Sequence, residues 1–449
     1  MRKLFGTDGI RAIAGQSPLD AHTIYAIGLA LAHSLKKVSI APRVVLGMDT
    51  RESSTWIAAT ITAGLKTGGA AVESAGVITT PAIAFLTAKH GFSAGIVISA
   101  SHNPWQDNGI KIFGADGYKL ADEVELAIED EIFKHLETSH APPLADLAAP
   151  AVNEADRAEY IRFLLAAVPN LSLDGKTIVI DCANGAASAV APQVFAELKG
   201  TVIITHASPD GRNINEQCGA LHAGMVAKAV VEHKANMGIT FDGDADRALF
   251  ADAAGNVVNG DAIMLLAARD LQARGLLAGD VVVATTMSNM GLEAALKRSG
   301  IKMLRAPVGD KYVLEEMRNA KASLGGEQSG HILFPAIATT GDGLLTALIV
   351  LDLVHRSGKT LGELKQDLKV FPQVIVNVKV REKKPLEDIP SVVEKIRAAE
   401  LELADTGRVV IRYSGTESLA RVMIEAESED AMKLHANAIA DAIRIELGI

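Results

Sequence analysis

Three aspartates stand at alternate positions of one short segment, TFDGDADR: Asp242, Asp244 and Asp246. In an extended chain this spacing directs all three carboxylates to one face. Converging carboxylates suit Mg²⁺, a hard cation that takes carboxylate, phosphate and water oxygens. An EF-hand is excluded, because Arg247 stands where that loop needs glycine and Ala253 where it needs glutamate. We expect a magnesium site rather than an acidic surface turn, whose crowded like charges would repel one another.

A serine and a histidine are adjacent in the segment ISASHNPWQDNGIK, which starts at Ile98. On an extended chain the side chains of Ser101 and His102 point to opposite faces. The chain also lacks the GxSxG elbow of serine hydrolases, so a Ser-His hydrolase is excluded. Pro104 stiffens the turn that follows. Taken alone, the segment indicates a turn serine, with His102 orienting the loop.

Two further loops carry polar side chains suited to ligands. RYSGTES, which starts at Arg412, follows an apolar strand with hydroxyl donors and a glycine, and Arg421 comes shortly after it. This composition predicts a cradle for a phosphate dianion, although serine, glycine and threonine are also ordinary turn residues. GGEQSGH, which ends at His331, combines a carboxylate, a hydroxyl and an imidazole that could bind sugar hydroxyls. The alternative interpretation of this segment is an ordinary solvent-exposed loop.

The elements that must position these loops alternate in type along the chain. Short apolar β-rich runs precede longer helical patterns, which is typical of βαβ units. Apolar strands of this kind open at Val44, Ile178 and Val281, and their spacing predicts three similar α/β domains. Residues 139–156 are rich in alanine and proline, which indicates a linker. After Phe371 the pattern changes to that of a small α+β domain.

Composition excludes several classes of protein. The chain has 449 residues, of which 49% are hydrophobic and 22% charged, so it can bury large cores and is not disordered. Its net charge of -10 without a basic block argues against nucleic acid as a partner. The longest apolar run, 344–354, is interrupted by Asp352 and is too short to span a membrane. Two cysteines and the lack of a signal-peptide pattern indicate a cytoplasmic protein.

Taken in order, the segments FGTDGIR, ASHNP, DGDADR, GEQSGH and RYSGTE resemble those of the α-D-phosphohexomutase superfamily. The resemblance covers the whole chain and implies three similar mixed α/β domains and a smaller α+β C-terminal domain around a central cleft. The implied domains are 1–150 with a phosphoserine loop, 151–253 with the metal loop, 254–368 with a sugar-binding loop and 369–449 with a phosphate-binding loop. Within the superfamily, FGTDGIR, the PDGRNINEQCGA segment and Gln328 resemble the branch that acts on glucosamine phosphates.

The resemblance also implies roles for single residues. Ser101 would carry a phosphoryl group and complete the site of one Mg²⁺ per subunit with the three aspartates. Glucosamine 6-phosphate would become glucosamine 1-phosphate, a precursor of UDP-N-acetylglucosamine, through a 1,6-bisphosphate that turns round in the site. The residues expected to catalyse the transfer are Ser101, Lys111, Arg11 and His331. Those expected to bind substrate are Glu327, Ser329, Arg247, Arg412, Ser414, Gly415, Thr416 and Arg421.

Partners follow from the same resemblance. We expect a small amino-sugar phosphate as substrate and glucosamine 1,6-bisphosphate, or a related hexose bisphosphate, as activator. A homodimer stays open, as does the origin of the phosphoserine, which either an unidentified kinase or autophosphorylation could supply. Alternative functions are a phosphomannomutase/phosphoglucomutase, a non-catalytic sugar-phosphate-binding protein and a phosphatase with an aspartate nucleophile. The phosphatase is disfavoured because neither Asp49 nor Asp181, each at the end of a predicted strand, lies in a DxD motif.

Overall fold

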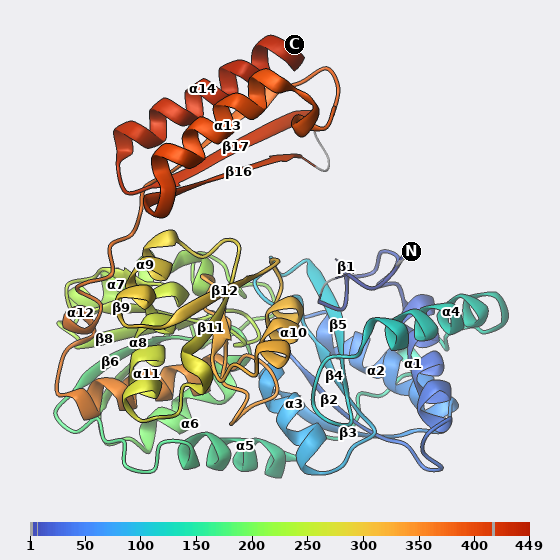
Figure 1. Ribbon diagram of the computed structural model, residues 1–449. Coiled ribbons are helices and arrows are strands. Elements are labelled where there is room, and N and C mark those ends of the chain that lie inside the picture. Colours follow the sequence, from blue (N-terminus) through green and yellow to red (C-terminus); the bar gives the residue numbers. More distant parts are fainter. Residues whose placement is uncertain (1–2, 7, 415–417) are drawn as a thin grey trace. The chain divides into compact units, whose positions relative to one another are not determined.

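The computed structural model describes residues 3–6, 8–414 and 418–449 (Figure 1). The chain forms two compact units, one of residues 1–287 and 304–365 and the other of residues 288–303 and 366–449. Each unit has its own buried apolar residues. Within residues 3–6, 8–414 and 418–449, no helix has both the length and the apolar character that crossing a bilayer requires.

The first sheet has the strand order β1-β5-β4-β2-β3. Its strands are β1 (Ile10–Ile13), β2 (Arg43–Met48), β3 (Ala71–Val77), β4 (Ala94–Ile98) and β5 (Asp107–Gly114). Strand β2 pairs parallel with β3 and β4, whereas β5 pairs antiparallel with β4 and β1. The helices of this part are α1 (Ala21–Lys36), α2 (Ser54–Thr67), α3 (Thr80–Lys89) and α4 (Asp122–Thr138).

The second sheet repeats this arrangement in the order β10-β9-β8-β6-β7. Its strands are β6 (Thr177–Asp181), β7 (Thr201–Thr205), β8 (Met237–Phe241), β9 (Ala248–Asp252) and β10 (Val257–Val258). Its helices are α5 (Glu154–Ala166), α6 (Ala191–Ala196) and α7 (Gly224–Glu232). Both cysteines, Cys182 and Cys218, are buried and free. In the predicted linker before this sheet, residues 144–146 form a 3-10 turn and α5 begins at Glu154.

The third sheet has the order β12-β11-β13-β14. Its strands are β11 (Val281–Thr285), β12 (Lys302–Ala306), β13 (Gly325–Gly326) and β14 (Ile332–Leu333). The helices of this part are α8 (Gly260–Ala273), α9 (Met290–Arg298), α10 (Asp310–Ala320), α11 (Gly343–Ser357) and α12 (Leu361–Leu364). Helix α9 belongs to the second compact unit, where its N-cap residue Asn289 donates to the carbonyl of Phe371 at 3.0 Å.

The three sheets place their candidate residues at equivalent points. In each, a central strand runs parallel to one neighbour, and the next strand in sequence returns antiparallel beside it. The connections are 99–106 between β4 and β5, 242–247 between β8 and β9, and 327–331 between β13 and β14. They hold Ser101, the three aspartates and the EQSGH residues, respectively. The prediction of three similar mixed α/β domains is confirmed.

The C-terminal residues form a smaller α+β domain, as predicted (Figure 1, red). Strands β15 (Gln373–Lys379), β17 (Leu419–Ala426) and β16 (Gly407–Tyr413) pair antiparallel in that order. Alternate residues such as Val376 and Val422 pack with helices α13 (Pro390–Leu403) and α14 (Glu429–Leu447) in one apolar cluster. The central cleft between four domains stays a prediction.

Candidate phosphoryl-transfer site

Ser101 follows strand β4 and is buried, with 2% of its surface exposed. Its backbone is left-handed, at φ 53°, which is uncommon for a residue other than glycine. Its N–H donates to Ser99 Oγ at 2.9 Å, and Ser99 Oγ donates to Asp49 Oδ2 at 2.7 Å. The expectation that Ser101 and His102 point to opposite faces is wrong: Ser101 Oγ and His102 Nδ1 lie 3.3 Å apart. The chain is not extended at Ser101, so strand alternation does not apply there.

The three aspartates after β8 converge, with ligand oxygens within 4.8 Å of one another. Their convergence was predicted, but a turn produces it rather than an extended segment, since Ala245 between them has φ 56°. Ser101 Oγ donates to Asp242 Oδ2 at 2.6 Å. The hydroxyl therefore lies against the predicted metal site.

The charges of these aspartates favour a bound cation. Burial, and then the charges of Asp246 and Asp244, raise the pKa of Asp242 well above its usual range. Among the described residues, Asp244 Oδ1 and Asp246 Oδ1 are buried and accept no hydrogen bond. Unsatisfied buried carboxylate oxygens are unfavourable unless a cation or donor meets them. Oxygen-only ligands of this kind fit Mg²⁺.

Lys111, on β5, brings a positively charged side chain to these carboxylates. Its buried Nζ lies 2.8 Å from Asp244 Oδ2 and 3.5 Å from Asp246 Oδ2. Burial alone would lower the pKa of Lys111, but the charges of Asp244, Asp8 and Asp246 outweigh it and raise the pKa well above its usual value. Conversely, burial alone would raise the pKa of Asp246, whereas Lys111 and His331 hold that pKa well below its usual range. Lys111 is therefore charged in the folded protein.

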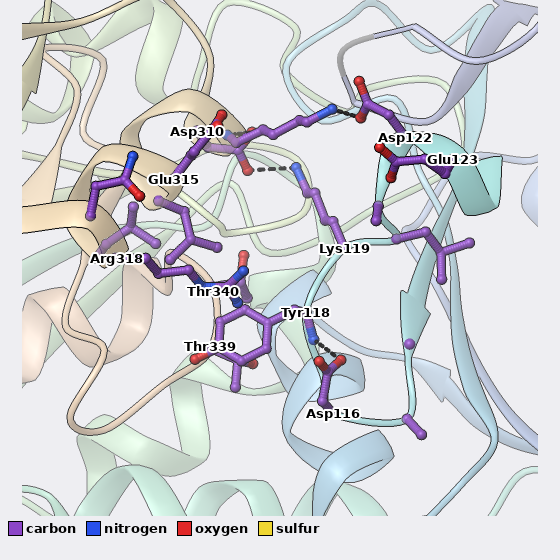
Figure 2. A pocket seen from close by; sticks show the side chains of 18 residues that line it. Asp116, Tyr118, Lys119, Asp122, Glu123, Asp310, Glu315, Arg318, Thr339 and Thr340 are labelled. Atoms are coloured by element: carbon purple, nitrogen blue, oxygen red, sulfur yellow. Dashed lines mark hydrogen bonds and ion pairs between the residues drawn. The ribbon is translucent and has the colours of Figure 1, made fainter. Parts of the chain in front are cut away.

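Asp8 forms ion pairs with three cationic side chains, one of which is Lys111. Its carboxylate pairs with Arg11, with Lys111 at 3.0 Å and with Lys119. Lys119 also pairs with Asp310, the first residue of α10, at 2.5 Å, and Figure 2 shows this side chain crossing to α10. These ion pairs join the N-terminal segment to the third α/β domain.

The loop between β13 and β14 adds a second polar group. Glu327 accepts hydrogen bonds from the Gly309 N–H at 3.0 Å and from Ser329 Oγ at 3.2 Å. His331 lies between two carboxylates, with Nδ1 3.6 Å from Asp246 Oδ1 and Nε2 3.6 Å from Asp310 Oδ2. Burial alone would lower the pKa of His331, but Asp246 and the neighbouring carboxylates raise it to about 9.

A cavity of about 370 Å³ joins residues from all three α/β domains. Its lining comprises Leu4, Gly6, Asp8, Gly9, Arg11, His102, Lys119, Asp246, Arg247, Val308, Gly309, Asp310, Glu327 and His331. Gln328 is absent from this lining and donates to Asp261 Oδ2 at 3.2 Å. A second depression of about 820 Å³, drawn in Figure 2, shares Lys119 and Asp310 with the first. This Lys119–Asp310 pair therefore borders both spaces.

The predicted phosphate-binding residues lie in the other compact unit. Arg412 and Arg421 are directly opposite each other in the β16–β17 pairing. Ser414 is buried, and its N–H donates to the Leu419 carbonyl at 2.8 Å. Gly415 and Thr416 lie outside the described residues. The two arginines are therefore cross-strand neighbours in the sheet of the C-terminal domain.

Sequence reasoning missed several residues of the site. Asp8 lies within FGTDGIR, three residues before Arg11, and its carboxylate could have been considered with that arginine. Lys119 and Asp310 have no comparable motif, since 191 residues separate them. Thr80, at the start of α3, donates to Asp244 Oδ2 and also had no local signal.

Four family models match the chain in sequence order. They are described as phosphoglucomutase/phosphomannomutase alpha/beta/alpha domain I over residues 2–139, domain II over 158–255, domain III over 259–371 and C-terminal domain over 375–442.

Curated relatives match over the full chain. A phosphoglucosamine mutase of Koribacter versatilis is 59% identical over 455 residues, covering 100% of this chain and 98% of that protein. One of Solibacter usitatus is 50% identical over 447 residues, covering 100% and 99%.

Solved structures share the fold at lower identity. A phosphoglucomutase/phosphomannomutase family protein of Burkholderia thailandensis has a TM-score of 0.79 at 22% identity, covering 99% of both chains. An Aspergillus fumigatus N-acetylphosphoglucosamine mutase in complex with GlcNAc-6P and magnesium has a TM-score of 0.61 at 18% identity, covering 99% of this chain and 96% of that one.

Proposed function

The chain belongs to the phosphoglucomutase/phosphomannomutase family, and on this premise we propose that it interconverts glucosamine 6-phosphate and glucosamine 1-phosphate. The activity is that of the relatives named above, which match the chain from end to end. It would supply the precursor of UDP-N-acetylglucosamine. One observation carries the proposal: the Ser101 hydroxyl lies 2.6 Å from a carboxylate oxygen of Asp242, one of three buried aspartates that could hold a metal ion.

Ser101 is proposed to carry the phosphoryl group between turnovers. In the first transfer the bond from phosphorus to Ser101 Oγ breaks, and a new bond forms to O1 of glucosamine 6-phosphate. The O1 proton passes to a base. Ser101 Oγ takes up a proton as its bond to phosphorus breaks. The resulting 1,6-bisphosphate turns round, and its O6 phosphoryl group returns to Ser101 Oγ, which gives up that proton while O6 gains one, leaving glucosamine 1-phosphate. Such a transfer depends mainly on positioning and on neutralising the phosphoryl charge.

Asp242, Asp244 and Asp246 would hold Mg²⁺ together with the phosphoryl group on Ser101. When bound, the cation offsets the negative charge of the transferring group. Lys111 supplies further positive charge at the same carboxylates, and Arg247 borders the cavity beside them. The buried oxygens of Asp244 and Asp246 that accept no hydrogen bond support this assignment.

Proton transfer is assigned to His331, with Lys111 and Arg11 assisting through their positive charge. Lys111 and His331 both contact Asp246, so each lies close to the proposed transfer. His331 borders the cavity, which supports its access to a sugar hydroxyl. Arg11 also borders the cavity and would stabilise negative charge near Ser101.

Substrate recognition is proposed for two sets of residues. Glu327 and Ser329 would bind sugar hydroxyls in both orientations of the bisphosphate. The distal phosphate would be bound by Arg412, Ser414, Gly415, Thr416 and Arg421. The register of Arg412 opposite Arg421 supports this, because paired guanidinium groups suit a phosphate dianion.

Further parts of the proposal concern the protein's setting. We place it in the cytoplasm, acting on a small amino-sugar phosphate, with glucosamine 1,6-bisphosphate or a related hexose bisphosphate as activator. A homodimer and a first phosphorylation of Ser101 by a kinase or by autophosphorylation belong to the same proposal. Native mass spectrometry of freshly purified protein would report both the subunit number and the added phosphoryl mass.

The deciding experiment compares wild type with Ser101→Ala on glucosamine, mannose and glucose 6-phosphates, with Mg²⁺ and a trace of glucose 1,6-bisphosphate. Wild type should turn over glucosamine 6-phosphate fastest, and Ser101→Ala should lose turnover while keeping the wild-type melting temperature. Ser357→Ala, at an exposed position, is the matched control. Activity in Ser101→Ala would refute the phosphoserine mechanism. Preference for mannose or glucose phosphate would assign the alternative mutase, and binding without turnover a sugar-phosphate-binding protein.

A further inference from the structure

Two side chains from different domains donate to the same pair of carbonyl oxygens in the Ser101 loop. Arg51 Nη2 lies 3.0 Å from the carbonyl oxygen of Ser101 and 2.9 Å from that of Asn103. Asn215 Nδ2 lies 2.9 Å and 3.1 Å from the same two oxygens. Arg51 is 2% exposed and Asn215 is 9% exposed, and their two hydrogen bonds to the Ser101 carbonyl are buried. Shielded hydrogen bonds hold a loop more firmly than exposed ones.

Arg51, the donor from the first domain, is itself held by a buried carboxylate. Arg51 Nε donates to Asp49 Oδ2 at 2.8 Å. The same carboxylate oxygen accepts from Ser99 Oγ, which in turn accepts the Ser101 N–H. The peptide groups on both sides of the Ser101 α-carbon are therefore bound to one buried network.

The second-domain half depends on Asn215. Its backbone is left-handed, at φ 58°, and its N–H donates to the Ala183 carbonyl at 2.9 Å. Ala183 is itself left-handed, at φ 56°. Strained conformations of this kind persist only where the surrounding structure holds them, and they concentrate at functional sites. The left-handed backbone directs the Asn215 amide to the loop of the neighbouring domain.

The loop of the three aspartates, residues 242–247, also approaches the Ser101 carbonyl. A Cβ on Gly243 would lie 2.4 Å from the Ser101 carbonyl oxygen and 2.9 Å from Asn215 Nδ2. The backbone of the DGDADR segment thus abuts the carbonyl that Asn215 holds. Since Asn215 and the three aspartates belong to the same α/β domain, the contact fixes Ser101 relative to those aspartates.

We propose that Asn215 is a positioning residue for phosphoryl transfer: it ties the Ser101 peptide to the domain that carries the metal ligands, so that Ser101 Oγ keeps its place beside Asp242. The inference rests on the proposed function. Asn215 does not line the cavity, so its loss affects the transfer step and leaves substrate affinity nearly unchanged.

Asn215→Asp tests this role with little change in shape. Aspartate tolerates the left-handed backbone and has the size of asparagine, but it presents an oxygen instead of an N–H donor to the two carbonyls. Asn213→Asp is the matched control, because Asn213 lies two residues away and its amide donates to Ser208 O at 3.1 Å, away from the Ser101 loop. Both variants add the same charge to the same segment.

The measurements are kcat and KM for glucosamine 6-phosphate, and the rate at which glucose 1,6-bisphosphate loads a phosphoryl group onto dephosphorylated enzyme, followed by intact-protein mass. For Asn215→Asp we expect kcat and the loading rate to fall about 100-fold, as for a displacement of about 1 Å at a reacting group. KM should stay within about twofold of wild type. Asn213→Asp should match wild type in all three quantities.

Wild-type loading and kcat in folded Asn215→Asp would overturn the inference. If that variant does not fold, Asn215→Gly replaces it, because glycine suits the left-handed backbone and removes the whole side chain with its amide. A folded Asn215→Gly with normal loading would overturn the inference equally. Wild-type enzyme that never gains phosphoryl mass at Ser101 would instead overturn the proposed function, and this inference with it.

Discussion

The hydroxyl of Ser101 donates a hydrogen bond to Asp242 Oδ2 at 2.6 Å across 141 residues of sequence. The serine follows β4 of the first sheet, and the aspartate follows β8, the corresponding strand of the second. Two copies of one arrangement thus supply the two halves of the site. The consequences of this contact can be measured at the residues that surround it.

Gly243→Ala should disturb the approach of the two loops. The new Cβ would lie 2.4 Å from the Ser101 carbonyl oxygen, so the backbone must shift. We expect a loss of about 1–3 kcal/mol in the free energy of unfolding and, because the Ser101 loop is displaced, a fall in kcat of about 100-fold. Urea denaturation and steady-state kinetics check both. Gly224→Ala has open space around its Cβ and should change neither quantity, whereas equal behaviour of the two variants would contradict the prediction.

Asp242→Asn should separate the cost of charge crowding from the benefit of the cation. Burial, Asp246 and Asp244 raise the pKa of Asp242, so removing its charge should leave the melting temperature in EDTA equal to or above that of wild type. The rise in melting temperature on adding Mg²⁺ should shrink, and its midpoint should move about 10-fold or more higher in concentration. Exposed Asp441→Asn serves as control. An unchanged Mg²⁺ response in Asp242→Asn would exclude this carboxylate as a ligand.

Lys111→Met should leave Asp8, Asp244 and Asp246 without their shared cation. Removing one partner from a buried set of charges costs about 3–5 kcal/mol of unfolding free energy, which urea denaturation in EDTA would detect. Mg²⁺ should restore part of the loss, because it replaces positive charge at the same carboxylates. Exposed Lys359→Met should stay near wild type. A wild-type stability for Lys111→Met would show that these ion pairs contribute little.

Asp342, the N-cap of α11, should make stability depend on pH. Burial raises the pKa of its carboxyl group from 3.8 to about 6, against hydrogen bonds from Leu345 and Tyr160. The folded protein therefore holds this proton more tightly than the unfolded chain, so ionisation of Asp342 opposes folding. The penalty is absent below pH 3.8, grows as the pH rises and is complete above about 6.

Asp342→Asn tests this by removing the titration while keeping an acceptor for the Leu345 N–H. The unfolding free energy of wild type minus that of Asp342→Asn should fall by about 2 kcal/mol between pH 4 and 7, because a tenfold difference in proton affinity between the folded and unfolded chain is worth about 1.4 kcal/mol and part of the change already occurs below pH 4. Taking the difference cancels groups common to both proteins. A difference that does not vary with pH would contradict the raised pKa.

Much of the architecture was accessible from the sequence because it depends on local patterns. Apolar strands opening at Val44, Ile178 and Val281 predicted three similar domains, and β2, β6 and β11 begin at or beside these residues. The spacing of the aspartates predicted their convergence, although a turn at Ala245 produces it rather than the extended segment that was expected. The antiparallel return of β5 after the Ser101 loop was not predicted, because pairing depends on a partner strand rather than on the pattern of one segment.

By itself, the sequence determined the residue types of the site and the loops that carry them, which short-range spacing and strand order are enough to specify. Only the tertiary structure decided which distant groups meet: Lys119 with Asp310, Thr80 with Asp244, and Asn215 with the carbonyl of Ser101. It also decided the left-handed backbone of Ser101, which brings its hydroxyl to Asp242 and next to His102. The physical reason is that such a backbone is unfavourable alone and persists only when long-range hydrogen bonds from two domains hold it.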